Sequence, residues 1–192
     1  YGNGETDEFI KPSILKSYEG FSKDSDGLFF MNYRSDRARE LLFALCDPKF
    51  NKFPRHKKIT LVAQSGLIEY SIEHKKFMES VLDVELSNNT LGQCISNANK
   101  KQFRLAETEK YPHVTFFFNS SVEVPALGES RFMVASPKVR TYDLAPEMSA
   151  YAITEKLLQL IREQSFDFIL VNYANPDMVG HTGSLRAAIE AC

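Results

Sequence analysis

Hydrophobic positions come in short blocks along the first eighty residues, and their spacing predicts alternating strands and helices. Two apolar runs, LFFMNY at 28–33 and KITLVA at 58–63, are typical of buried strands. The segment 35–45 between them repeats its leucines at helical spacing and begins at a serine suited to capping a helix. These residues are Ser35, Leu41, Leu42 and Leu45. Segment 73–82 predicts a helix or a mixed element.

The same alternation continues after a polar stretch around 83–90, where we expect a domain boundary. The segments expected to form strands are 113–118 (HVTFFF), 129–135 (ESRFMVA) and 166–173 (FDFILVNY), and those expected to form helices are 90–101, 146–164 and 184–192. The last strand is apolar almost throughout, as in a parallel sheet covered on both faces. This order of elements predicts an α/β fold with right-handed crossovers.

The longest helical pattern, 146–164, has a helix-starting signal and one apolar face. Pro146 suits the first position of a helix, and Glu147 complements the positive end of the helix dipole. We interpret the apolar stripe as core packing rather than as a ligand site. Its members are Met148, Ile153, Leu157, Leu160 and Ile161.

Composition and charge narrow the classes of function. The 192 residues are 43% hydrophobic with a formal net charge of −2, so nothing favours nucleic acid as a partner. No apolar run approaches the roughly 18–20 residues that span a bilayer, and no signal peptide opens the chain. The three cysteines are far apart and in no metal or redox spacing, which predicts free thiols in a reducing compartment, the cytoplasm by default.

The stretch VNYANPDMVGHTGS, 171–184, places Asp177 and His181 four residues apart, in an expected loop beyond the carboxyl end of a strand. Ligands of α/β sheets gather at that edge. One oxygen and one nitrogen suit a divalent metal such as Mn²⁺ or Zn²⁺. The alternative is an Asn-Pro surface turn with a structural histidine, and the spacing alone does not exclude it.

Two other places carry basic residues suited to an anion. Arg34 and Arg37 lie at a strand-to-helix junction, where two guanidinium groups suit phosphate or carboxylate. Ion pairing with Asp36 or Glu40 is an equal alternative. Lys110, ahead of an apolar run, suits either an anion or a loop cap.

Three stretches together resemble one family. FMNYRSDRARELL, the long stretch beginning ETEKYPHVTFFF, and VNYANPDMVGHTGS are similar to motifs of the cofactor-independent phosphoglycerate mutases. Their order and approximate separations also agree, and the likeness extends from about residue 7 to residue 192.

The resemblance implies a two-domain metalloenzyme that interconverts 3-phosphoglycerate and 2-phosphoglycerate in glycolysis through a phosphoserine, acting as a monomer without nucleic acid or membrane. Residues 1–84 would be the C-terminal part of an inserted transferase domain. Residues 85–192 would be part of an alkaline-phosphatase-like domain.

The same likeness implies a role for each candidate residue. Arg34 and Arg37 would hold the substrate, and Lys110 would contact the migrating phosphoryl group. Asp177 and His181 would bind one of two divalent ions, usually Mn²⁺.

The chain departs from the family chiefly in length. The family's nucleophilic serine and an aspartate ligand precede the matched segment, and further histidine and aspartate ligands follow it. We therefore expect an internal fragment without turnover of its own. NSS at 119–121 stands where the family usually has Asn-Gly-Gly, and Ser35 where it has proline or alanine.

Two alternatives stay open. One is another phosphomutase or a phosphodiesterase of the alkaline phosphatase superfamily, although the YRSDRARE arginines speak against it. The other is a fragment that binds an anion or a partner without chemistry.

Overall fold

The computed structural model describes the whole chain except residues 1, 6–8, 22–24 and 84–86. The chain divides into two compact units, one of Lys11–Glu85 and one of Tyr1–Ile10 with Leu86–Cys192. The boundary expected between residues 84 and 85 lies outside the described residues.

The Lys11–Glu85 unit is built on a three-stranded parallel sheet. Its elements are β1 (Gly27–Phe30), α1 (Ala38–Cys46), β2 (Ala63–Ile68), the 3₁₀ turn η2 (His74–Lys76) and β3 (Glu79–Leu82), with strand order β1-β2-β3. The buried side chains Leu42, Tyr70 and Met78 form its core with the start and end of α1. Parallel pairing brings the carboxyl ends of the strands to one edge.

Of two expectations for this unit, one was wrong in position and the other was confirmed in one of its two forms. The strand expected at 58–63 lies at β2 instead, because parallel pairing with β1 begins at Ala63 and runs to Gly66. Segment 73–82 is a mixed element, as one of its two expected forms had it: the turn η2 ends where Phe77 leaves helical geometry with φ −142°, and β3 follows. The β3 strand then pairs with β2.

The helix expected at 35–45 exists but begins later. Arg37, not Ser35, occupies the N-cap position, and no side chain caps the helix. Leu42 is fully buried, whereas Leu41 is half exposed and faces away from the core.

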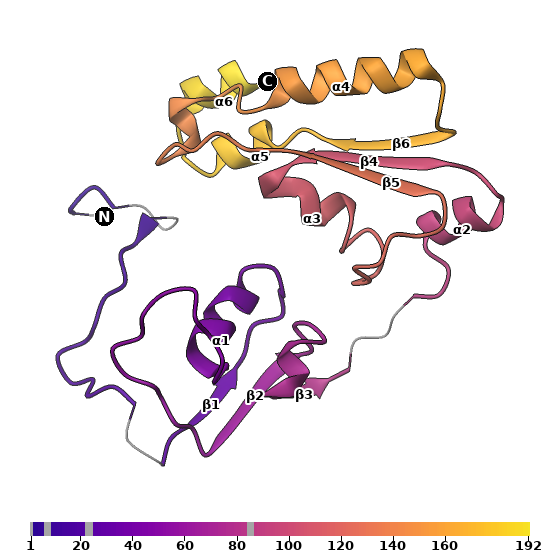
Figure 1. Ribbon diagram of the computed structural model, residues 1–192. Helices are drawn as coiled ribbons and strands as arrows, with labels where there is room; N and C mark the ends of the chain where they lie inside the picture. Colours follow the sequence, from indigo (N-terminus) through magenta and orange to yellow (C-terminus); the bar gives the residue numbers. More distant parts are fainter. Residues whose placement is uncertain (1, 6–8, 22–24, 84–86) are drawn as a thin grey trace. The chain divides into compact units, whose positions relative to one another are not determined.

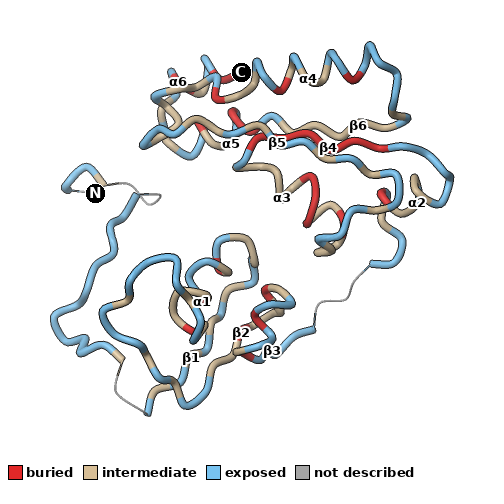
Figure 2. The backbone as a smooth tube through the Cα atoms, in the orientation of Figure 1, coloured by how far each residue is buried: buried red, intermediate tan, exposed pale blue. Residues whose placement is uncertain are grey.

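The second unit places a parallel sheet between helices (Figure 1). Its elements are α2 (Leu91–Asn97), β4 (Gln102–Glu107), η3 (Thr108–Lys110), α3 (Tyr111–Val114), β5 (Glu129–Val134), η4 (Tyr142–Leu144), α4 (Ala150–Glu163), β6 (Phe168–Asn172), α5 (Asn175–Gly180) and α6 (Leu185–Ala191). The strand order is β5-β4-β6, α4 covers one face and α2 and α3 lie on the other. Every residue of β4 is buried, as the tube in Figure 2 shows.

The expected strand at 113–118 was wrong, and the central strand β4 was missed. Tyr111–Val114 form a helical turn with Pro112 in its first positions, where proline is well tolerated. In β4, Phe103 and Leu105 face α4, whereas Arg104 lies beneath α2, so the strand is sandwiched between two layers.

The long helix was placed correctly but begins four residues later than expected. Pro146 and Met148 precede α4, and Met148 packs instead with α5 and α6. Of the expected stripe, Ile153 and Leu160 are buried and Leu157 packs beside them, whereas Ile161 is 53% exposed.

The remaining expected elements are confirmed with shorter bounds. The strands expected at 129–135 and 166–173 are β5 and β6, and the helices expected at 90–101 and 184–192 are α2 and α6. The loop expected around Asp177 is partly helical, because α5 spans Asn175–Gly180. The α/β fold class is confirmed.

Candidate active site at the carboxyl edge of the second sheet

The short helix α5 brings Asp177 and His181 onto one face. They lie one helical turn apart directly after β6, and the backbone N–H of His181 donates to the carbonyl of Asp177. The Oδ1 of Asp177 lies 3.5 Å from the Nε2 of His181, and both side chains are half exposed. The Nδ2 of Asn175 donates to the Ala191 carbonyl, which fixes α5 to α6.

Lys110, which is distant in sequence, contacts Asp177 as well. Its ammonium group forms an ion pair with Oδ2 of Asp177, and its side chain is only 15% exposed. The hydrogen bond from Lys110 lowers the pKa of Asp177, against a smaller opposing effect of burial, and the charge of Lys110 and His181 adds to the lowering. The structure thus brings together three of the five residues singled out in the sequence.

A network that sequence reasoning missed holds the turn η3 that carries Lys110. The backbone N–H of Glu109 donates to Ser136 Oγ, and the Tyr142 hydroxyl donates to the Glu109 carboxylate at 2.8 Å. Thr108 Oγ1 accepts from the backbone N–H of Ser136 at 3.1 Å. The segment after β5 therefore holds Thr108 and Glu109, the two residues that precede Lys110. No local sequence signal marks these contacts, since they join positions about thirty residues apart.

The carboxyl group of Glu107, the last residue of β4, is fully buried at the same edge. Its Oε1 accepts from the backbone N–H of Ser149 at 3.4 Å, while its Oε2 has no hydrogen-bond partner. Burial raises the pKa of Glu107, and hydrogen bonds from Ser136 and Ser149 offset only part of that effect.

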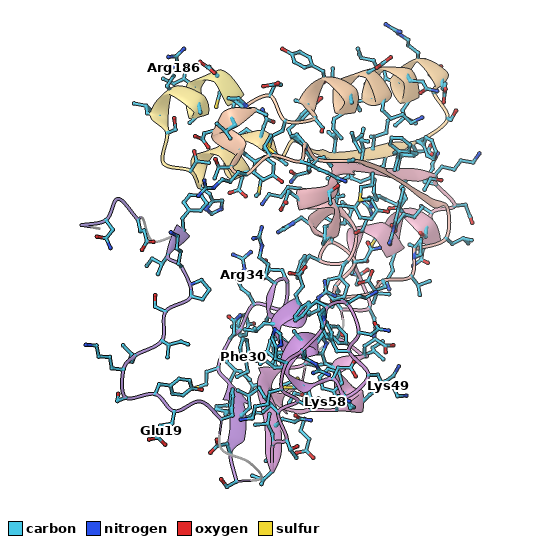
Figure 3. The ribbon with its side chains drawn as sticks, turned by 60° about the vertical axis from the view of Figure 1, so that its left-hand side comes forward. Glu19, Phe30, Arg34, Lys49, Lys58 and Arg186 are labelled. Atoms are coloured by element: carbon cyan, nitrogen blue, oxygen red, sulfur yellow. The ribbon has the colours of Figure 1, made fainter. Side chains whose placement is uncertain are left out.

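Arg34 and Arg37 lie in the other unit, after the carboxyl end of β1. Arg34 projects from the segment beyond Phe30 (Figure 3), with its side chain 74% exposed and one guanidinium nitrogen 2.9 Å from Asp36 Oδ2. Burial raises the pKa of Asp36, but the Arg37 backbone N–H and the Arg34 charge outweigh burial and lower it overall. The ion pair with Asp36 was one of the two expected alternatives, and it leaves most of the guanidinium group in solvent.

The carboxylate of Asp177 in α5 and the imidazole of His181, which follows α5, are spaced as two ligands of one divalent metal ion. Ligand atoms about 2.1 Å from one ion, at octahedral or tetrahedral angles, lie about 3.0–3.4 Å from each other. The 3.5 Å between Oδ1 of Asp177 and Nε2 of His181 is close to that separation. Among the described residues, however, no three histidine, cysteine, aspartate or glutamate side chains gather as a complete ligand set.

The structure also bears on the cysteines and on membrane-spanning segments, which the composition had raised. All three cysteines are unpaired, as expected. Within the part of the chain that the structure describes, no helix combines the length and apolarity needed to cross a membrane.

Two protein-family models match overlapping parts of the chain. The Metalloenzyme superfamily matches residues 58–192, and the BPG-independent PGAM N-terminus matches residues 1–72. Together they extend from the first residue to the last.

Individual relatives agree with these families. The chain is 53% identical over 192 residues to the 2,3-bisphosphoglycerate-independent phosphoglycerate mutase of Paracoccus denitrificans and 54% identical to that of Agrobacterium fabrum. It spans 38% and 37% of their respective lengths.

A crystal structure of Leishmania mexicana phosphoglycerate mutase at low cobalt concentration is similar in fold, with a TM-score of 0.72 and 27% identity. The match covers 81% of this chain and 28% of that one. The resemblance drawn from the three motifs is confirmed.

Proposed function

Because the chain belongs to the metalloenzyme superfamily, we propose that it is an internal segment of a 2,3-bisphosphoglycerate-independent phosphoglycerate mutase, which interconverts 3-phosphoglycerate and 2-phosphoglycerate. The observation that carries the proposal is the convergence of Lys110, Asp177 and His181 at the carboxyl edge of one parallel sheet. In this proposal residues 1–84 are the end of the transferase domain and residues 85–192 are part of the phosphatase domain, and the division of the chain into compact units near residue 85 supports that boundary.

Asp177 and His181 would hold one of two divalent ions, for which manganese is our choice. Such an ion, when bound, supplies positive charge that activates a nucleophile and polarises a phosphoryl oxygen. The lowered pKa of Asp177 keeps its carboxylate ionised, as a metal ligand must be. Lys110, mostly buried beside it, would offset negative charge on the transferring phosphoryl oxygens.

Arg34 and Arg37 would hold the carboxylate and phosphate of the substrate. Both side chains are exposed at the end of a strand, and guanidinium groups bind such anions through two parallel hydrogen bonds. Asp36 keeps Arg34 oriented until an anion takes part of its hydrogen bonds.

We infer a monomer in the cytoplasm, and no turnover by these 192 residues alone. The nucleophilic serine and the remaining metal ligands of the family belong to segments that this chain does not match. Two ligands leave a metal site incomplete, and metal affinity falls with each missing ligand.

An enolase-coupled mutase assay tests the proposal on the full-length enzyme that contains this chain, with Mn²⁺ supplied. Asp177→Ala is expected to lower kcat at least about 100-fold, because a metal ligand is lost. The matched control is Asp167→Ala, since Asp167 also pairs with a lysine but precedes β6 at the other end of the strand. Equal activity of the two variants, or turnover of phosphopentoses instead of phosphoglycerate, would overturn the proposal.

A further inference from the structure

We propose that Tyr70 and His74 are positioning residues that clamp the two ends of the arginine-bearing segment 32–39 and so present Arg34 and Arg37 to an anionic substrate. This inference rests on the proposed function of the two arginines. It concerns residues of a single compact unit, and neither Tyr70 nor His74 was singled out in the sequence.

The Tyr70 hydroxyl holds the beginning of the segment. It lies 2.9 Å from the Phe30 carbonyl and 2.6 Å from the Asn32 carbonyl, and the residue is 2% exposed. One hydroxyl proton is thus shared between two backbone acceptors on either side of Met31. These contacts fix the chain where it leaves β1, two residues before Arg34.

The His74 imidazole holds the end of the segment. Its Nε2 lies 3.2 Å from the Arg39 carbonyl, which only accepts, so Nε2 carries the proton. In the neutral ring Nδ1 then accepts from Ser71 Oγ at 2.8 Å. The ring is 1% exposed, and burial lowers its pKa, which favours this neutral form. The bond is made two residues after Arg37.

Aromatic packing makes both holding groups rigid. The Tyr70 ring packs edge-on against Phe30, and the His74 ring packs against both Phe43 and Phe77 with ring centroids 4.1 and 5.2 Å away. Gly66 of β2 makes room for the tyrosine, because a Cβ at that position would lie 2.4 Å from Cε2 of Tyr70. Side chains this buried and this closely packed have little room to move.

The clamp fixes the backbone of the segment and leaves the two arginine side chains exposed. The segment is tied at Phe30, Asn32 and Arg39, while Arg34 and Arg37 between these ties reach solvent. Fixing the backbone in advance lowers the entropy lost when an anion orders the two guanidinium groups. The binding of a substrate that contacts both arginines at once therefore depends on Tyr70 and His74, which hold the backbone that carries them.

The experiment compares Tyr70→Phe with Tyr151→Phe in the full-length enzyme, using the coupled assay with 3-phosphoglycerate and Mn²⁺. Tyr70→Phe keeps the ring and removes only the hydroxyl, whereas Tyr151 is 80% exposed on α4 and serves as the control. We expect KM to rise roughly three- to tenfold for Tyr70→Phe with kcat changed less than twofold. A purely structural role would leave KM of the folded enzyme unchanged.

Two further variants test the clamp by other routes. Gly66→Ala displaces the Tyr70 ring and is expected to raise KM in the same way. His74→Ala is expected to raise KM, and His74→Gln to restore it in part, since the glutamine amide also donates. A KM unchanged in Tyr70→Phe and in His74→Ala would overturn the clamp.

The double variant Arg34→Ala/Arg37→Ala distinguishes this failure from failure of the proposed function. If that variant loses substrate affinity while Tyr70→Phe does not, the arginines bind substrate without the clamp. If the double variant keeps full affinity, the proposed role of the arginines fails, and the clamp fails with it.

Discussion

At the scale of single residues, the backbone at Ser120 and Ser121 is unusual. Both have positive φ, 55° and 65°, in the left-handed region that costs non-glycine residues about 1–2 kcal/mol. These are the two positions at which the family that the chain resembles usually has glycine. The serine hydroxyl at 120 has a partner, since it accepts from the Ser87 backbone N–H.

Ser121→Gly should therefore stabilise the protein by about 0.5–1 kcal/mol, because relief of the strained backbone exceeds the entropy that glycine loses on folding. Urea unfolding measures the change. The control Ser165→Gly alters a serine after α4 with ordinary φ, and it should be neutral or destabilising. A loss of stability in Ser121→Gly would contradict the argument.

Glu107 gives a prediction about pH. Its folded-state pKa is raised above the ordinary 4.5, so at pH values between 4.5 and the folded-state pKa the native state binds more protons than the unfolded state. Stability is consequently lost as pH rises from 4.5 through the folded pKa. Glu107→Gln removes this loss and should be more stable than the parent at pH 8, by on the order of 1 kcal/mol, with a smaller gain at pH 4. Thermal unfolding at both pH values checks it, and an equal gain at both would rule out titration as the cause.

At the scale of elements, the positions of α4 differ in how much they contribute to stability, because they differ in burial. Ile153 is fully buried against β4, whereas Ile161 is half exposed although both belong to the expected stripe. Ile153→Ala should destabilise the protein by about 2–4 kcal/mol, and Ile161→Ala by less than about 0.5 kcal/mol. Chemical denaturation of the two variants tests this, and similar losses would mean that the stripe is packed along its whole length.

The elements found from the sequence were those with one clear apolar pattern, such as the stripe of α4 and the continuous apolar run of β6. The central strand β4 was missed because Arg104 and Glu107 interrupt its apolar pattern. Both are buried, and Arg104 is covered by the Phe118 ring and bonded to Gln102, which are tertiary contacts that no local pattern contains. The run at 113–118 failed for the converse reason: its β-forming residues follow Pro112, which starts a helical turn instead.

The candidate site was predictable only in part. The four-residue spacing of Asp177 and His181 was visible in the sequence, and so was the strand before them. The ion pair between Lys110 and Asp177 joins positions far apart in the chain and was not predicted, since the likeness to a family implied only that Lys110 contacts the phosphoryl group. The contacts of Tyr70 and His74 with backbone carbonyls gave no signal, because backbone acceptors exist at every residue.

At the scale of the whole molecule, the two compact units carry different parts of the proposed chemistry. One presents two arginines for the substrate anion, and the other presents a lysine and two metal donors. The chain spans about 38% of the length of the mutases that it matches, so the proposed cycle needs residues beyond those described here. For this chemistry Asp177 must be a metal ligand rather than only the ion-pair partner of Lys110.

The most direct test of that claim is a Mn²⁺ titration of the full-length enzyme, followed by electron paramagnetic resonance of the free ion. We predict that the wild type and the control Asp167→Asn bind two tight ions, and that Asp177→Asn binds one. Two tight ions in Asp177→Asn as well would contradict the claim and leave Asp177 as the partner of Lys110 alone.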